Sequence, residues 1–165
     1  MSGTSVTPPP IDSRIGFMAA LDWGFEQAVA RDARRIVCVD PDWADWPWDD
    51  VALLERLVAW LKRPQRRLVL IARRYDDVPR RSPRFTAWRR DWVHAIEAWS
   101  PSEGYAGELP TLFLDDRATV VHLVDRRHWR GEALVDERTA GLWRERTDAV
   151  LQRSEPAFSA SQLGL

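Results

Sequence analysis

Residues 66–74 read Arg-Arg-Leu-Val-Leu-Ile-Ala-Arg-Arg, five apolar residues with a pair of arginines on each side. An apolar run without polar alternation is typical of a strand that is covered on both faces, as in a parallel sheet between helices. A second run of this kind, Ile36-Val37-Cys38-Val39, occurs earlier in the chain and ends at Asp40. The two runs predict the centre of the fold.

The segment between the two runs has the pattern of a helix. Apolar residues recur at three- and four-residue steps from Val51 to Leu61, after Asp49 and Asp50 and before Lys62-Arg63-Pro64. Strand, helix and strand in this order form a right-handed βαβ unit, so the two strands are expected to run parallel. Their carboxyl ends then share one edge of the sheet, where open α/β sheets bind ligands.

The remaining patterns add three helices and a hairpin. Helices are predicted from Asp12 or Ser13 to about Arg31, from Ser82 with an apolar stripe that reaches Trp99, and from Glu137 to Arg153. Residues 111–125 form two extended runs around Asp115-Asp116-Arg117, and Glu132–Val135 is a further short strand. The predicted fold class is α/β, a mixed sheet with a parallel βαβ core and a C-terminal hairpin, with helices on both faces.

Bulk composition indicates one soluble globular domain, because the chain has 165 residues of which 45% are hydrophobic and 30% are charged. We expect residues 1–11 to be a disordered lead-in, residues 12–158 to be the domain and residues 159–165 to be a tail. No run of about 18 apolar residues is present, which predicts no membrane insertion. The single cysteine, Cys38, and the lack of a visible secretory signal favour a cytoplasmic location.

Basic residues gather in one part of the chain, although the net charge is −1. Eleven Lys and Arg residues and two acids lie from Lys62 to Arg90, whereas six acids and no base lie from Asp40 to Glu55. Guanidinium groups fork onto phosphates and aromatic rings stack on bases, so these segments predict an anion site. Alternatively, two oppositely charged surfaces neutralise each other and the aromatic stripe is core. The candidate ligand-binding residues are Asp40, Asp42, Trp43, Arg73, Arg74, Arg84, Trp88, Arg89 and Asp116.

The strand-end aspartates also permit an enzymatic interpretation. Asp40 and Asp42, with Asp115-Asp116 in the hairpin, resemble the aspartates of haloacid-dehalogenase-like phosphohydrolases, in which one carboxylate attacks phosphorus and others hold magnesium. The sequence departs from that family, because Trp43-Ala44 replaces a small hydroxyl or glycine pair. Helix capping or pairing with arginines explains these acids equally well. The three histidines lack metal-ligand spacing, so no metal or cofactor is predicted.

The order of the elements from about residue 15 to 158 resembles one half of a phospholipase D-like fold. In that family a catalytic motif of histidine, any residue, lysine, four residues and aspartate enters the hairpin, and it falls here on Leu109, Thr111 and Asp116. The resemblance therefore implies a degenerate domain that has lost its nucleophile and the supporting lysine but keeps a phosphate-binding groove. Residues 40–43, 72–76 and 83–92 are also similar to an uncharacterised bacterial domain family of unknown function.

The predicted function is a non-catalytic binding or regulatory module for a phosphorylated or anionic ligand, with nucleic acid as one version. Half-size members of the resembled family assemble two copies around a shared site, which implies a homodimer that uses some of the ten tryptophans. One alternative is a magnesium-dependent phosphohydrolase that uses Asp40, Asp42 and Asp116. The other is a structural protein-interaction domain that docks through the tryptophans.

Overall fold

The two apolar runs form neighbouring parallel strands at the centre of a mixed sheet. In the computed structural model, which describes residues 7–105 and 107–159, strand β1 (Arg35–Val39) pairs with β2 (Arg67–Ile71) so that Val37 lies opposite Val69. Helix α2 (Val51–Leu61) connects them and begins at Asp50, whose side chain accepts a hydrogen bond from the Ala52 N–H. The predicted βαβ unit is therefore confirmed.

Five further strands extend the sheet on both sides of this unit. The order is β6-β5-β4-β1-β2-β3-β7 in the described part of the chain, with β3 parallel to β2 and all other added pairs antiparallel. The added strands are β3 (Ile96–Pro101), β4 (Thr111–Asp115), β5 (Thr119–Asp125), β6 (Arg130–Val135) and β7 (Ser154–Pro156). The predicted hairpin is β4 and β5, and the predicted short strand is β6.

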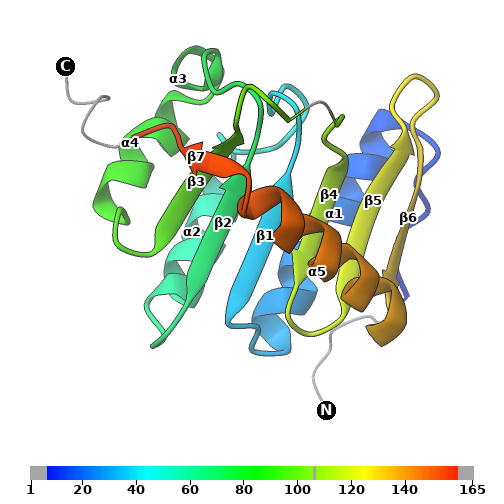
Figure 1. The fold of residues 1–165 in the computed structure, drawn as a ribbon. Coiled ribbons are helices and arrows are strands. Elements are labelled where there is room, and N and C mark those ends of the chain that lie inside the picture. The colour runs from blue at the N-terminus through cyan, green and yellow to red at the C-terminus, as the bar shows by residue number, and fades with distance from the viewer. Residues whose placement is uncertain (1–6, 106, 160–165) are drawn as a thin grey trace.

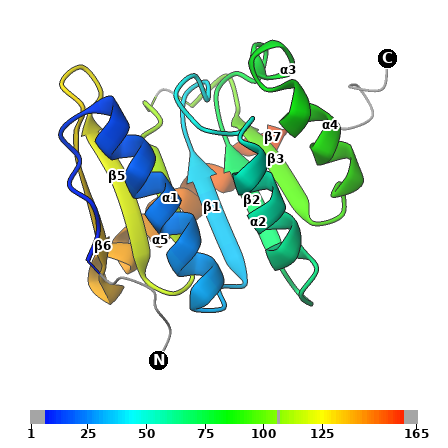
Figure 2. The same cartoon turned by 180° about the vertical axis from the view of Figure 1, so that it is seen from behind.

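Helices cover both faces of the sheet, but unequally (Figures 1 and 2). Helices α1 (Arg14–Ala30), α2 and α4 (Pro83–Asp91) lie on one face, and α5 (Glu137–Leu151) crosses the other face alone. Successive strand residues alternate between the two cores, so Ile36 and Cys38 join the first core while Val37 and Val39 pack under α5. The single helix leaves room beside it at the carboxyl edge of the sheet.

The helix that begins at Pro83 is shorter than predicted. It ends at Asp91, and residues 96–101 form β3 instead of continuing its apolar stripe. Ile96 packs in the core below α1 and α2, whereas Trp99 packs under α5, so the two residues lie on opposite faces. Their three-residue spacing fits a helix as well as it fits opposite sides of a strand, which explains the wrong boundary.

The structure contains two short elements that the sequence did not predict, and it describes only part of the predicted lead-in and tail. The short helix α3 (Val78–Arg81) and the edge strand β7 were not predicted. Residues 1–6 of the predicted lead-in and 160–165 of the predicted tail lie outside the described residues, while Ile11 is buried against the core. In the described ranges, no helix has the length and apolar character needed to span a bilayer.

Candidate functional site

A pocket of about 1260 Å³ opens between α5 and the carboxyl edge of the sheet. The ends of β1, β2 and β5, the loop before β4 and one side of α5 form its walls. Its described lining contains a single carboxylate, that of Glu108, and five arginines: Arg73, Arg74, Arg126, Arg146 and Arg153. The pocket therefore presents an excess of positive charge at the edge where ligands of open α/β sheets bind.

Arg126 is neutralised by the carboxylate of Asp40, which is fully buried at the end of β1. Its Nη2 lies 2.5 Å from Asp40 Oδ1 and also donates to the Thr111 hydroxyl, while its Nη1 donates to Asp45 at 3.1 Å. The Thr111 hydroxyl donates to Asp40 at 2.7 Å, and the Trp43 N–H donates to it at 2.7 Å. Asp40 Oδ2 thus holds the loop after β1 through the Asp42 and Trp43 N–H groups, and Oδ1 binds Thr111 on β4 and Arg126.

The other four arginines of the lining form no ion pair with any carboxylate in the described residues. Arg73 donates to the carbonyl oxygens of Tyr105, at 2.9 Å, and Gly107, and lies 5.4 Å from the centre of the Tyr105 ring. Arg146 lies 5.0 Å from the centre of the Trp143 ring. Neutral carbonyls and rings orient these guanidinium groups but leave their charge uncompensated.

His122 and Trp143 form the aromatic wall of the pocket. The two ring centres are 4.5 Å apart at an interplanar angle of 61°. Burial lowers the pKa of His122 below its ordinary value of 6.5, Glu132 opposes this shift, and the positive charge of Arg146 adds to it. The imidazole is therefore neutral at pH 7 and takes up its proton only in more acidic solution.

Of the nine residues predicted to bind a ligand, Arg73 and Arg74 line the pocket. Their backbone N–H groups both donate to the Pro41 carbonyl at 3.1 Å, so the carboxyl ends of β1 and β2 adjoin as expected. Asp42 accepts a hydrogen bond from the Ala44 N–H, and Trp43 is buried with a left-handed backbone (φ 67°). Asp40, Asp42 and Trp43 do not line the pocket: Asp40 binds the lining residues Thr111 and Arg126, and Trp43 packs in the core on the other face of the sheet.

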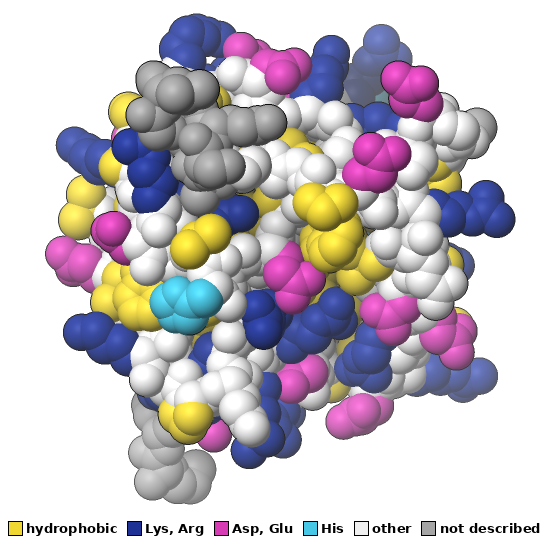
Figure 3. All heavy atoms as spheres, turned by 60° about the vertical axis from the view of Figure 1, so that its left-hand side comes forward, with side chains coloured by type: hydrophobic (Ala, Val, Ile, Leu, Met, Phe, Trp, Pro, Cys, Tyr) yellow, Lys and Arg dark blue, Asp and Glu magenta, His cyan; other side chains and the backbone are white. Residues whose placement is uncertain are grey.

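Arg84, Trp88 and Arg89 lie elsewhere, on α4 at the other face of the sheet. The backbone N–H of Arg84 donates to Asp49 at 2.8 Å, Trp88 packs against Phe85, and Arg89 is buried. Figure 3 shows basic and acidic side chains interspersed over the surface seen from this side of the molecule. The arginine-rich segment therefore does not form one continuous basic face with the pocket.

Asp116 lies at the opposite end of the sheet from Asp40. Its carboxylate accepts a hydrogen bond from the Arg34 N–H at 3.0 Å, and its own N–H donates to the Arg35 carbonyl at 3.2 Å. The five residues of β1 separate the two aspartates by roughly 16 Å at the usual rise per residue. Asp116, a candidate ligand-binding residue, therefore lies at the other end of the sheet from Arg73 and Arg74 and does not line the pocket.

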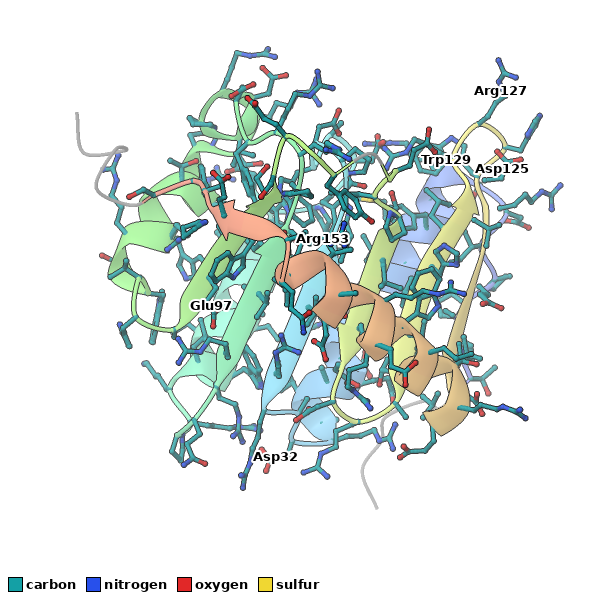
Figure 4. The ribbon with its side chains drawn as sticks, viewed as in Figure 1. Asp32, Glu97, Asp125, Arg127, Trp129 and Arg153 are labelled. Carbon is teal, nitrogen blue, oxygen red and sulfur yellow. The ribbon has the colours of Figure 1, made fainter. Side chains whose placement is uncertain are left out.

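Sequence reasoning missed Arg126, His122, Trp143, Arg146 and Arg153. Trp143 precedes Arg146 by three residues, so their shared face of α5 can be predicted from the sequence, whereas Arg153 follows the end of that helix. Arg153 lies where α5 leads into β7 (Figure 4). Which sheet edge this helical face meets depends on how α5 crosses the strands. That crossing cannot be read from spacing.

No cluster of three or more side chains suited to hold a metal ion occurs in residues 7–105 and 107–159.

The ten tryptophans are all described, and none is exposed: Trp23, Trp43, Trp46, Trp48 and Trp60 are buried, and the other five are half-buried. Trp143 lines the pocket. The tryptophans therefore serve mainly as core, and Trp143 is the one that lines the pocket.

Two solved structures resemble this fold. TrmBL2, an archaeal chromatin protein described as showing a novel mode of DNA binding, matches with a TM-score of 0.55 and 13% identity over 90% of this chain and 53% of that chain. Phosphatidylserine synthase from Haemophilus influenzae Rd KW20 matches with a TM-score of 0.54 and 11% identity over 87% of this chain and 37% of that chain. The chain thus spans about half, or less, of the length of these proteins.

No family model and no curated protein matches the sequence, so the resemblance to an uncharacterised bacterial family finds no support there. At identities this low, the two neighbours establish the fold alone. The chain has a mixed α/β fold of the phospholipase D-like kind, as the order of its elements predicted.

Proposed function

We propose that this chain is a degenerate phospholipase D-like domain that binds a phosphate-containing ligand in the arginine-lined pocket and does not turn it over. The observation that carries the proposal is the uncompensated charge of Arg73, Arg74, Arg146 and Arg153 around one pocket. Arginine is suited to phosphate because its planar donors match the phosphate oxygens. A bound anion would neutralise charges that now have no partner.

The residues at the positions of the family motif support a binding role without catalysis. Leu109 and Thr111, which the resemblance aligns with the histidine and the lysine, both line the pocket. A leucine side chain cannot attack phosphorus, and the Thr111 hydroxyl is engaged with Asp40. We therefore expect no hydrolysis of a generic phosphodiester such as bis(p-nitrophenyl) phosphate, with or without magnesium. Magnesium-dependent hydrolysis of p-nitrophenyl phosphate that is lost in a folded Asp40→Asn variant would favour the phosphohydrolase alternative instead.

Nucleic acid is one version of the ligand. The DNA binding described for TrmBL2 and the size of the pocket support a polymeric phosphodiester as this ligand. A polymer that contacts several arginines releases several counterions, so its affinity would fall steeply between about 50 and 200 mM salt. A small phosphorylated ligand would show a shallower dependence on salt.

The test is anisotropy of a fluorescent oligothymidylate together with calorimetric titration of pyrophosphate. Changing Arg74→Ala with Arg153→Ala should weaken whichever probe binds by about tenfold or more, because a charge-assisted hydrogen bond contributes about 1.5 kcal/mol or more. The matched control is Arg127→Ala. The Arg127 side chain points away from the molecule at the tip of the β5–β6 turn (Figure 4) and does not line the pocket.

Two results would contradict the proposal. One is that neither probe binds the wild-type chain, and the other is that the double variant binds as tightly as Arg127→Ala does. Binding of pyrophosphate without binding of oligothymidylate would assign the pocket to small phosphorylated ligands.

A homodimer belongs to the same proposal, because the resembled half-size proteins use two copies. The large hydrophobic residues that are exposed in the described ranges lie apart, on different elements: Ile15, Val51, Val93, Val124 and Leu142. Val124 alone among them lines the pocket. Sedimentation equilibrium tests the dimer, and a Val124→Asp variant that stays dimeric would place the interface away from the pocket.

A further inference from the structure

Arg89 is a buried arginine without a counter-ion. Only 4% of the residue is exposed, and its Nε and Nη1 atoms have no hydrogen-bond partner. No carboxylate in the described residues forms an ion pair with it, and burial lowers its pKa. Removing a guanidinium group from water without a partner is costly, and an acceptor such as an anion would offset that cost.

The ring of Phe158 lies beside this guanidinium group and belongs to a stack of aromatic rings. The Phe158 ring centre lies 5.9 Å from the Arg89 guanidinium carbon. The Phe158 ring is nearly parallel to that of Tyr75, at 5.2 Å and 11°, and to that of Phe85, at 6.3 Å and 1°. Trp88, next to Arg89, also has a buried indole Nε1–H without a partner. Phe158 thus stacks between the rings of Tyr75 and Phe85, beside the unpaired donors of Arg89.

Within the described residues, the segment that carries Phe158 is joined to the sheet only along its β3 edge, where the Ala157 N–H also donates to the Ala98 carbonyl at 2.9 Å. Residues 154–159, which we call the strap, lie at the edge of the sheet, where β7 pairs with β3 over three residues. One of those residues, Pro156, has no N–H to donate, and Phe158 itself has a left-handed backbone (φ 48°) that is strained for a residue with a side chain. Short edge pairings of this kind open at low cost in free energy.

We propose that Arg89 anchors a second ligand site, which takes a small aromatic anion, and that the Phe158 ring holds the place of the ligand's ring until the strap moves aside. A ring in the place of Phe158 would keep the contacts with Tyr75 and Phe85. A carboxylate or phosphate attached to that ring would supply the acceptors that the Arg89 nitrogens lack. Neither Arg89 nor Phe158 lines the arginine-lined pocket, so the two sites are separate.

The first experiment removes the Phe158 ring from the full chain with Phe158→Ala and titrates small probes by NMR. Benzoate and phenyl phosphate carry the ring and the charge, benzyl alcohol carries the ring alone, and acetate carries a charge alone. We expect the better of the two aromatic anions to bind at least tenfold more tightly than benzyl alcohol or acetate. Comparison of benzoate with phenyl phosphate then identifies the anionic group.

Equal or tighter binding of benzyl alcohol would overturn the proposal, since any apolar cavity accepts a neutral ring. Failure of all probes to bind Phe158→Ala would overturn it as well. Adding Arg89→Met to Phe158→Ala should reverse the preference, so that benzyl alcohol binds more tightly than either anion.

A second measurement does not depend on Phe158→Ala being folded. Arg89→Met in the otherwise unchanged chain keeps the volume and removes the unpaired charge, so we expect Tm to stay the same or to rise by about 2–4 °C. Benzoate in excess should raise the Tm of the wild-type chain and leave that of Arg89→Met unchanged. Equal shifts in both proteins would contradict the site.

The outcomes for the two sites are independent. Arg74→Ala with Arg153→Ala should leave the benzoate effect intact, and Arg89→Met should leave binding of oligothymidylate or pyrophosphate intact. Loss of both kinds of binding in either variant would mean that the two sites are one, against this inference.

Discussion

At the residue scale, His122 gives the arginine-lined pocket a pH dependence. Its imidazole faces Trp143, Arg146 and Glu132, and it is neutral at pH 7 because burial lowers its pKa. A bound anion stabilises the protonated ring, so anion affinity should increase as the pH falls through and below 6.5, the ordinary value. We predict a gain of about tenfold in sulfate affinity from pH 8 to about pH 5.5, which calorimetry can measure.

Sulfate keeps the same charge across this range of pH, so a change in its affinity would come from protonation of the protein. His122→Gln should abolish the gain. His128→Gln is the matched control, because His128 is exposed and bonded to Asp125 outside the pocket. A gain that survives in His122→Gln, or one that vanishes in His128→Gln, would contradict the assignment.

Without a ligand, the lowered pKa of His122 reduces the stability of the fold in acid. The unfolded chain binds this proton more readily than the folded chain does, so the free energy of unfolding decreases below about pH 6.5.

The contacts of the Asp40 carboxylate indicate that it stabilises the fold. It accepts hydrogen bonds from two backbone N–H groups, the Thr111 hydroxyl and Arg126. We predict that Asp40→Asn lowers the free energy of unfolding by about 2–3 kcal/mol, because a neutral amide replaces an acceptor-only group beside a guanidinium group. Urea denaturation measures this loss. Asp77→Asn, which removes an exposed partner of Arg80, should cost less than about 0.5 kcal/mol, and equal losses would refute the structural role.

At the scale of elements, Gly141 weakens α5 without a packing reason. Its backbone φ is not positive, and a Cβ atom added there would meet nothing within 4 Å. We predict that Gly141→Ala raises the free energy of unfolding by about 0.5–1 kcal/mol, measured by urea denaturation. In contrast, Gly131→Ala on β6 would place a Cβ 2.3 Å from the His122 carbonyl oxygen and should destabilise the fold. If both changes altered the free energy of unfolding by similar amounts, the space around each glycine would not explain their effects.

The sequence predicted an element correctly where its local pattern fits only one kind of secondary structure. The apolar runs of β1 and β2 and the stripe of α2 fit a single structure, and the Asp115-Asp116-Arg117 turn fixes the hairpin. The boundary between α4 and β3 failed because Ile96 and Trp99 suit both a helix and a strand. Strand β7 has three residues, and only the exposed edge of β3 makes Ser154–Pro156 a strand.

At the scale of the whole molecule, the predicted topology was enough to place Arg73 and Arg74 in the pocket. The other arginines of the pocket could be placed only from the packing of the folded chain. Parallel strands bring Arg73 and Arg74 to the carboxyl edge, as predicted from βαβ handedness. Asp116 was misplaced because the hairpin turn lies at the amino end of β1, a consequence of the antiparallel pairing of β4 with β1. Arg126 and Arg146 come from distant segments, and only the packing of α5 over the sheet brings them together.

The central claim is that one pocket at the carboxyl edge, under α5, captures phosphate. The most direct test is amide NMR during titration of the full chain with pyrophosphate. We predict that the largest saturable shifts fall on residues 107–111, 122–126 and 143–153. Shifts that are largest on α2 and α4, or that never saturate at any of these positions, would contradict the claim.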